Sequence, residues 1–249
     1  MMQAMLFAAG KGTRLRPLTD TMPKAMVRVG GEPLIKRVID KLKASGTDRI
    51  VVNVHHFASQ ITDYLKANGN FGTDIRVSDE TDRLLNTGGG LKKAASLFDD
   101  TAPILIHNVD ILSNLNLTRF YQLALDGENG QQADAVLLVS ERKTQRYFLF
   151  NDDMQLVGWT NISTGELKTP YENMRVENCR KLAFAGIHVF SPRLFEMMKQ
   201  WPDEFSIVDF YLAACANHRI VGYAKSDLKI LDIGKLDTLQ YAEEFLKEL

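Results

Sequence analysis

The sequence predicts an α/β protein in which helices cover both faces of a mostly parallel sheet, giving three layers. Short β-branched or apolar runs alternate with stretches whose apolar residues recur at helical spacing, which is typical of right-handed βαβ units. The 249 residues are 45% hydrophobic and 24% charged, ordinary values for one globular domain or two small ones. The net charge of -1 gives no global field that would favour nucleic acid or an anionic membrane, so neither partner is expected.

The cysteines and the first residues bear on localisation. Cys179 and Cys215 form no metal-type cluster, which favours a reduced cytoplasmic protein, with one disulfide as the alternative. The apolar start is too short for a signal peptide, and no apolar run reaches the length of a membrane span.

The most informative stretch lies near the start, where an apolar strand over Ala4–Ala9 runs into a turn with Gly10 and Gly12. Because glycine has no Cβ, the backbone N–H groups of such a turn can approach an anion closely. Four cations follow within about one loop, namely Lys11, Arg14, Arg16 and Lys24. The segment predicts a cradle for a polyphosphate; for the glycine turn alone, a plain structural turn is the alternative.

Two better-known phosphate loops do not fit this stretch. The dinucleotide fingerprint needs a third glycine where this chain has Leu15, and Pro17 and Pro23 disfavour the long helix that should follow. The Gly-Lys-Ser/Thr end of the Walker loop is absent.

The whole run resembles the signature of nucleotidyltransferases that join a nucleoside triphosphate to a sugar 1-phosphate. The matching residues are Gly10, Gly12, Thr13, Arg14, Leu15, Pro17, Leu18, Thr19, Pro23 and Lys24. The resemblance implies a Rossmann-like, GT-A-like fold in a single domain 1–249, with a nucleotide half over about 1–125 and a sugar half over about 126–249. It implies that Arg14 and Lys24 are catalytic and that the nucleotide is bound by Ala8, Ala9, Gly10, Lys11, Gly12 and Thr13.

The elements of the first half follow from apolar spacing. Helices are predicted over Leu34–Ala44 and Ser59–Ala67, and strands over Ile50–Val54 and Ile75–Ser78.

Three glycines, Gly88 to Gly90, then lead into a helix predicted over Leu91–Phe98. The stretch is either a plain connection or a place where a flat base packs on bare backbone. The family carries a base-holding Thr-Gly-Gly or Thr-Ala-Gly element here, which implies nucleotide contacts for Asn86, Thr87, Gly88 and Gly89. The form Leu-x-Thr-Gly-Gly-Gly resembles the uridylyltransferases that act on N-acetylmuramate 1-phosphate more than the mannose 1-phosphate guanylyltransferases.

A buried strand over Pro103–Asp110 ends in a carboxylate, at the position where ligands bind in open α/β sheets. A turn or cap role for Asp110 is the alternative. The family has a Gly-Asp pair here whose aspartate binds Mg²⁺, which implies the same for Asp110 and a nucleotide contact for Asn108. Val109 replaces the usual glycine and adds a side chain beside the nucleotide.

The second half is predicted to continue with a helix over Leu115–Leu125, a polar loop over Gly127–Gln132 and a strand over Ala135–Val139. Residues 140–180 read as short strands and turns, a small hairpin excursion that would bind sugar. Trp159 and Asn161 are candidates for the sugar pocket, with hairpin packing as the alternative for Trp159. The Glu-Lys-Pro triplet of many relatives is absent here.

The strand over Leu182–Phe190 resembles the family's Phe-x-Gly-Ile-x-Val element, which implies that the sugar lies against Gly186. His188 alternates with apolar residues and is expected to be packed, not to act as a base. The segment Lys229–Gly234 partly resembles the family's Trp-x-Asp-x-Gly-Thr element, which implies that Asp232 is a second Mg²⁺ ligand. A closing helix is predicted from Leu236 to Leu249.

The resemblance implies an Mg²⁺-dependent transfer of a nucleotidyl group to a sugar 1-phosphate, in a monomer or simple homo-oligomer. UTP with N-acetylmuramate 1-phosphate, a reaction of cell-wall sugar recycling, is the preferred pair. The alternatives are guanylyl, cytidylyl or uridylyl transfer to mannose, heptose or glucose 1-phosphate, a non-catalytic sugar-nucleotide-binding regulator, and a dinucleotide-binding dehydrogenase.

Overall fold

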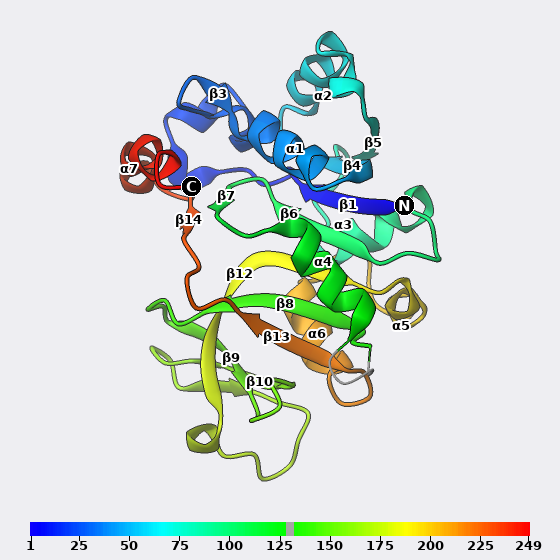
Figure 1. Ribbon diagram of the computed structural model, residues 1–249, viewed down its shortest axis with the longest axis vertical. Coiled ribbons are helices and arrows are strands. Elements are labelled where there is room, and N and C mark those ends of the chain that lie inside the picture. The colour runs from blue at the N-terminus through cyan, green and yellow to red at the C-terminus, as the bar shows by residue number, and fades with distance from the viewer. Residues whose placement is uncertain (128–131) are drawn as a thin grey trace.

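The computed structural model describes residues 1–127 and 132–249 and confirms the three-layer α/β class (Figure 1). The strand β1 (Met2–Phe7) lies inside a ten-stranded sheet and pairs in parallel with both β4 (Thr47–Val54) and β6 (Ile104–Asn108). The strand β5 (Asp74–Asp79) extends this parallel half beside β4. The carboxyl ends of these strands therefore meet at one edge of the sheet.

A long strand, β12 (Arg180–Phe190), makes the sheet mixed. Residues 187–190 of this strand pair antiparallel with β6, and its first three residues pair antiparallel with β9 (Arg146–Phe150). From Ala183 onward it also pairs antiparallel with β8 (Ala135–Ser140). The strand β13 (Ile220–Ala224) runs parallel to β8.

The predicted hairpin excursion is present in the second half. The strand β10 (Leu156–Asn161) pairs with β9 and with β11 (Glu166–Lys168). Elsewhere, β7 (Ile111–Ser113) and β14 (Ile230–Asp232) form a separate antiparallel pair. Residues 128–131, from the predicted polar loop, lie outside the described residues.

Two apolar cores lie on opposite faces of the sheet, because successive strand residues point to opposite sides. Ala4 and Leu6 of β1 belong to one core, which is covered by helices α1 (Leu34–Ala44), α2 (Ala58–Ala67), α4 (Leu117–Asp126) and α7 (Leu236–Leu246). Met5 belongs to the other core, which is covered by α3 (Asn86–Ala94), α5 (Phe195–Met198) and α6 (Ile207–Ala214).

The helix α3 differs from its prediction. It begins at Asn86, not near Leu91, and includes all three glycines. Glycine is a poor helix former, so the sequence favoured a loop here. Tertiary packing decides otherwise: a Cβ on Gly88 would lie 2.3 Å from the Phe205 ring, and one on Gly89 would lie 1.9 Å from the Asp203 carbonyl oxygen.

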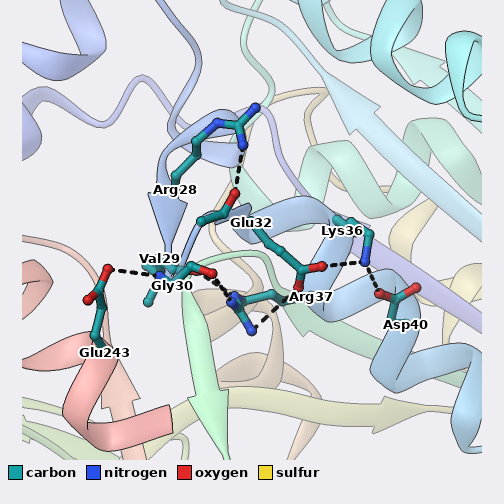
Figure 2. Close-up of polar contacts among 9 residues, drawn as sticks. Arg28, Val29, Gly30, Glu32, Lys36, Arg37, Asp40 and Glu243 are labelled. Carbon is teal, nitrogen blue, oxygen red and sulfur yellow. Dashed lines mark hydrogen bonds and ion pairs between the residues drawn. The ribbon is translucent and has the colours of Figure 1, made fainter.

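A short arm, β2 (Arg28–Val29) with β3 (Glu32–Pro33), lies between α1 and α7 (Figure 2). Arg37 donates hydrogen bonds from Nε to the Val29 carbonyl (2.8 Å) and from Nη2 to the Gly30 carbonyl (3.1 Å). The Gly30 amide donates to Glu243 of α7 (3.2 Å). These contacts join the arm that follows Lys24 to the helix that follows Asp232.

Cys179 and Cys215 are both free, so the structure does not contain the disulfide that was the alternative. Within the described residues, no helix combines the length and apolar character needed to cross a bilayer.

Candidate active site

A cavity of about 520 Å³ opens where the parallel strands β1, β4 and β6 end. Its lining includes the segment 9–14 and Lys24, together with Asn108, Val109 and Asp110. The remaining lining residues are Phe7, Asn53, Glu80, Leu84, Asn86, Thr87, Glu204 and Gly234. Segments far apart in the chain thus meet at the edge of the sheet where open α/β folds bind ligands.

The glycine turn has the open backbone that the sequence predicted. A Cβ on Gly10 would meet no atom within 4 Å, so the position faces free space. Gly12 has φ +63°, and a Cβ there would lie 2.9 Å from side-chain carbons of both Thr19 and Lys24. The Thr19 hydroxyl donates to the Gly12 carbonyl (2.8 Å) and holds the turn closed. Only glycine fits this backbone at Gly12.

Two cations of this turn are available for a ligand. In the part of the chain that the structure describes, neither Lys11 nor Arg14 forms an ion pair. Both side chains line the cavity and belong to exposed residues. Lys24, in contrast, is mostly buried and its ammonium group pairs with the Asp110 carboxylate.

Of the two predicted metal ligands, Asp110 lies in the turn between β6 and β7, and Asp232 is the last residue of β14. Asp232 pairs with Ile111 in the β7–β14 ladder, and the Ile233 amide donates to the Asp110 carbonyl (2.9 Å). Burial raises the pKa of the Asp232 carboxyl, and the negative charge of Asp110 raises it further, while Lys24 and Arg14 act in the opposite direction. Oδ1 of Asp232 is buried and has no hydrogen-bond partner among the described residues.

This arrangement fits a magnesium ion. Mg²⁺ is usually bound in proteins by one or two carboxylates together with substrate phosphates and water. A cation would compensate the repulsion between Asp110 and Asp232 and the unpartnered Asp232 oxygen. The described residues contain no group of three or more His, Cys, Asp or Glu side chains that could hold a metal, so further ligands would come from substrate or water.

Gly234 lies between Arg14 of the segment after the glycine turn and Asp232. A Cβ at this position would lie 2.8 Å from Arg14 Nη2 and 2.9 Å from Asp232 Oδ1. The guanidinium and the carboxylate therefore pack against the same bare backbone. This contact places a cation of the glycine turn beside the candidate metal ligand.

The predicted base-binding residues divide into two groups. Asn86 and Thr87 line the cavity, and the Thr87 hydroxyl also accepts a hydrogen bond from the Ile207 amide (3.0 Å). Gly88 and Gly89 are buried, and their amides donate to the Phe205 carbonyl (2.9 and 3.2 Å). Neither glycine is among the cavity-lining residues, and protein packing alone accounts for their missing side chains.

Ala8 also lies behind the cavity wall, where its amide donates to Oδ1 of Asn53 (2.8 Å). Asn53 in turn donates to the fully buried carboxylate of Glu80 (2.7 Å), which also accepts from the Leu85 amide (3.0 Å). Burial raises the pKa of Glu80. The sequence alone did not single out Glu80 or Asn53, which connect Ala8, just before the glycine turn, to Leu85, just before α3.

The predicted sugar-binding residues do not all lie at the cavity. Gly186 has φ +74° where β12 changes register, and a Cβ there would lie 2.7 Å from Nδ2 of Asn108. Trp159 and Asn161 lie on β10 and are not among the cavity-lining residues. Asn161 accepts hydrogen bonds from Ser163, and the Lys168 ammonium lies 5.3 Å from the Trp159 ring centre. Their sugar-binding role stays a prediction.

Comparison with known proteins identifies the family. Residues 3–248 match the family described as nucleotidyl transferase, which is almost the whole chain. The chain belongs to this family. The resemblance inferred from the glycine turn and Lys24 is therefore confirmed.

Other nucleotidyl transferases show how far the likeness extends. The chain is 30% identical to N-acetylmuramate alpha-1-phosphate uridylyltransferase of Caulobacter vibrioides, over 90% of this chain and 89% of that protein. It is also 30% identical to UTP–glucose-1-phosphate uridylyltransferase of Synechocystis, over 94% of this chain but 61% of that longer protein. Among solved structures, HddC of Yersinia pseudotuberculosis in complex with GMP-PN shares the fold, with a TM-score of 0.75, 21% identity, and coverage of 99% of this chain and 100% of that one.

Proposed function

We propose that this nucleotidyl transferase joins a nucleoside triphosphate to a sugar 1-phosphate and releases pyrophosphate. One observation carries the proposal: Arg14, Lys24 and Asp110 line one cavity with the open glycine turn, and Asp232 adjoins it at Gly234. Polyphosphate chemistry needs this combination of cations, carboxylates and exposed backbone amides.

The reaction follows from charge and position. An oxygen of the sugar 1-phosphate attacks the α-phosphorus of the nucleotide, and the bond from that phosphorus to the pyrophosphate oxygen breaks on the opposite side. The attacking oxygen already carries negative charge near neutral pH, so no general base is required. The barrier is the approach of two anions, which fixed cations lower.

Each residue then has a role in this transfer. The turn from Gly10 to Gly12 and Arg14 hold the β- and γ-phosphates and stabilise the departing pyrophosphate. Lys24 lies between the α-phosphate and the incoming phosphate, and Asp110 orients its ammonium group. Asp110 and Asp232 would hold Mg²⁺, which when bound supplies further neutralisation of the phosphate charge.

For the substrate pair we favour UTP and N-acetylmuramate 1-phosphate. Support comes from Leu85–Gly90, which resembles the uridylyltransferases of that substrate, and from the Caulobacter vibrioides relative, which matches over nearly its full length. Glucose 1-phosphate with UTP and mannose 1-phosphate with GTP are the alternatives, since relatives named for those substrates also match. The alternative from a different functional class is a regulatory protein that binds sugar nucleotides without catalysing their formation.

The proposal also covers the domain organisation, localisation and oligomeric state of the enzyme. The chain would act as one domain with its nucleotide half over about 1–125 and its sugar half over about 126–249. We place it in the cytoplasm, as a monomer or simple homo-oligomer, in the recycling of cell-wall sugars.

The test is pyrophosphate release with Mg²⁺, measured for four nucleoside triphosphates against N-acetylmuramate, N-acetylglucosamine, glucose, mannose and heptose 1-phosphates. A dominant signal with UTP and N-acetylmuramate 1-phosphate supports the preferred pair. A dominant signal elsewhere keeps the reaction and rejects the interpretation of Leu85–Gly90. Nucleotide binding without turnover for any pair favours the regulatory alternative.

A further inference from the structure

Two buried side chains form a hydrogen-bonded bridge behind the candidate active site. The Ala8 amide donates to Oδ1 of Asn53 (2.8 Å), and Nδ2 of Asn53 donates to Oε1 of Glu80 (2.7 Å). The second carboxylate oxygen of Glu80, Oε2, accepts from the Leu85 amide (3.0 Å). This Asn53–Glu80 bridge therefore connects the residue that follows β1 to the residue that precedes α3.

The bridge acts on backbone and is not placed to hold a ligand itself. Glu80 is 0% exposed and Asn53 is 3% exposed, although both border the cavity. Each end of the bridge holds the amide of a residue that leads into a cavity-lining segment. Residues 9–14 follow Ala8, and Asn86 and Thr87 follow Leu85. The bridge therefore fixes these two segments relative to each other.

The segment after Leu85 depends on such support. Asn86 has φ +63°, in the left-handed region that residues other than glycine adopt at a cost in free energy. A conformation of this kind persists where surrounding contacts fix it. Glu80 holds the Leu85 amide, and the Leu85 carbonyl accepts a hydrogen bond from the Phe205 amide (3.3 Å). The bridge thus helps to set the direction in which Asn86 enters the cavity.

The packing around the Glu80 carboxylate leaves it little freedom. A Cβ on Gly90 would lie 2.6 Å from Glu80 Oε1 and 3.1 Å from Asn53 Nδ2, so bare helix backbone lies against the bridge. Within residues 1–127 and 132–249, Glu80 forms no ion pair. Burying a carboxylate without a paired cation is unfavourable, so filling space is a poor explanation for this residue.

We propose that Glu80 is a positioning residue that sets the span between the glycine turn and Asn86–Thr87, so that a nucleoside triphosphate engages both at once. The inference rests on the proposed function, in which the turn holds the phosphates and Asn86–Thr87 contact the base. Two contacts on one rigid framework reinforce each other, because the second forms without a further loss of translational and rotational freedom. A change in the span therefore weakens binding of the whole nucleotide more than binding of its phosphates alone.

The test compares a nucleotide with inorganic triphosphate, which can occupy the glycine turn but has no base. Calorimetric titrations with Mg²⁺ first find which of ATP, CTP, GTP and UTP the natural chain binds most tightly. Glu80→Gln should weaken binding of that nucleotide roughly 10- to 100-fold, because the new NH₂ group faces one of the two N–H donors. Triphosphate binding should change by less than about threefold. Asp82→Asn, which removes a charge from an exposed residue of the same segment, should change neither affinity.

Asn53→Asp combined with Glu80→Gln restores the pattern of donors and acceptors and keeps the net charge. The new carboxylate at position 53 accepts from the Ala8 amide and from the new amide group at position 80, whose carbonyl oxygen accepts from the Leu85 amide. Nucleotide affinity should return to within about threefold of that of the natural chain. A double variant no better than Glu80→Gln overturns the proposal. So does unchanged nucleotide binding in Glu80→Gln, or an equal loss of nucleotide and triphosphate binding, which indicates a general structural role.

Gly90→Ala tests the bridge without removing a hydrogen-bonding group. Its Cβ displaces the Glu80 carboxylate, while alanine is a better helix former than glycine, so the variant should fold. Nucleotide binding should weaken at least about threefold and triphosphate binding should not; this variant decides if Glu80→Gln does not fold. A natural chain that releases pyrophosphate but binds triphosphate as tightly as nucleotide overturns this inference alone. Absence of both nucleotide binding and turnover rejects the proposed function as well.

Discussion

The ammonium group of Lys24 forms an ion pair with the Asp110 carboxylate across 86 residues of sequence, and both side chains are mostly buried. The pair joins the segment that follows the glycine turn to the end of β6. It also keeps a positive charge beside two carboxylates, Asp110 and Asp232, that would otherwise repel each other. In the proposed reaction the same cation faces the phosphates.

Lys24→Met should therefore lower turnover by about 10²- to 10³-fold, because a fixed charge at the reacting phosphates is lost. Its effect on the free energy of unfolding should depend on Asp110. A double-mutant cycle with Asp110→Asn, measured by urea unfolding without Mg²⁺, should give a coupling energy of about 1–3 kcal/mol. The exposed pair of Lys199 with Glu196 is the control and should show little coupling. Additive effects of Lys24→Met and Asp110→Asn would contradict the pairing.

Asp232→Asn should change stability and activity in opposite directions. The charged carboxylate is disfavoured in the folded protein, so the neutral amide should raise the thermal midpoint in the presence of a chelator by about 2–4 °C. Turnover with Mg²⁺ should fall by at least about a hundredfold, because a metal ligand is lost. A lower thermal midpoint with unchanged turnover would show that Asp232 has a purely structural role.

Two glycine substitutions test different roles with the same added methyl group. Gly10→Ala adds a Cβ that meets no protein atom, so the free energy of unfolding should change by less than about 1 kcal/mol, while nucleotide affinity should fall at least about tenfold. Gly89→Ala places its Cβ 1.9 Å from the Asp203 carbonyl oxygen, so it should destabilise the fold by about 1–3 kcal/mol. Urea unfolding and nucleotide titration measure both effects. Unchanged nucleotide affinity in Gly10→Ala would remove the glycine turn from the phosphate site.

Two buried histidines should make the fold sensitive to acid. Burial lowers the pKa of His107 and of His188 to about 3, and the charge of Lys41 adds to the effect on His107. Between pH 6.5 and 3 the unfolded chain binds protons that the native protein does not, so stability falls as the pH falls. At pH 5 each histidine should cost about 2 kcal/mol relative to neutral pH.

His188→Phe gives the matched comparison for this effect. His188 packs against Phe184 and Tyr211, and its ring makes no hydrogen bond in the part of the chain that the structure describes. An aromatic replacement therefore keeps the surroundings apolar. The difference in unfolding free energy between pH 7 and pH 5 should shrink by about 2 kcal/mol. A variant with the same pH dependence as the natural chain would show that His188 does not titrate during unfolding.

Much of the fold was predictable where local patterns and tertiary packing agree. The spacing of Leu34 to Leu42 predicted α1 with its observed bounds, and the apolar run before Gly10 predicted β1. The start of α3 was not predictable, because its three glycines disfavour a helix and only distant packing explains them. Gly88 and Gly89 pack against the Asp203–Phe205 segment, and Gly90 packs against Glu80 and Asn53. Sequence patterns do not show which remote backbone will pack against a glycine.

The candidate site, too, was predictable only in part. Gly10, Gly12, Arg14 and Lys24 belong to one continuous stretch, so their proximity could be predicted. Glu80 carried a usable signal, since it follows β5 as Asp110 follows the end of β6, but the acids around it obscured the comparison. Asn53 offered no such signal, because its role depends on hydrogen bonds to Ala8 and Glu80 that only the folded sheet creates.

The inner position of β1 has a consequence for how the chain assembles during synthesis. Gln3 of β1 pairs with Ile104 of β6. One edge of β1 therefore stays unpaired until the ribosome has added roughly a hundred more residues. At a synthesis rate of about 5–20 residues per second, the interval between the synthesis of β1 and that of β6 lasts roughly 5–20 s. During that interval an apolar strand has an unpaired edge, so we expect nascent chains of this protein to be prone to edge-to-edge association until β6 has been made.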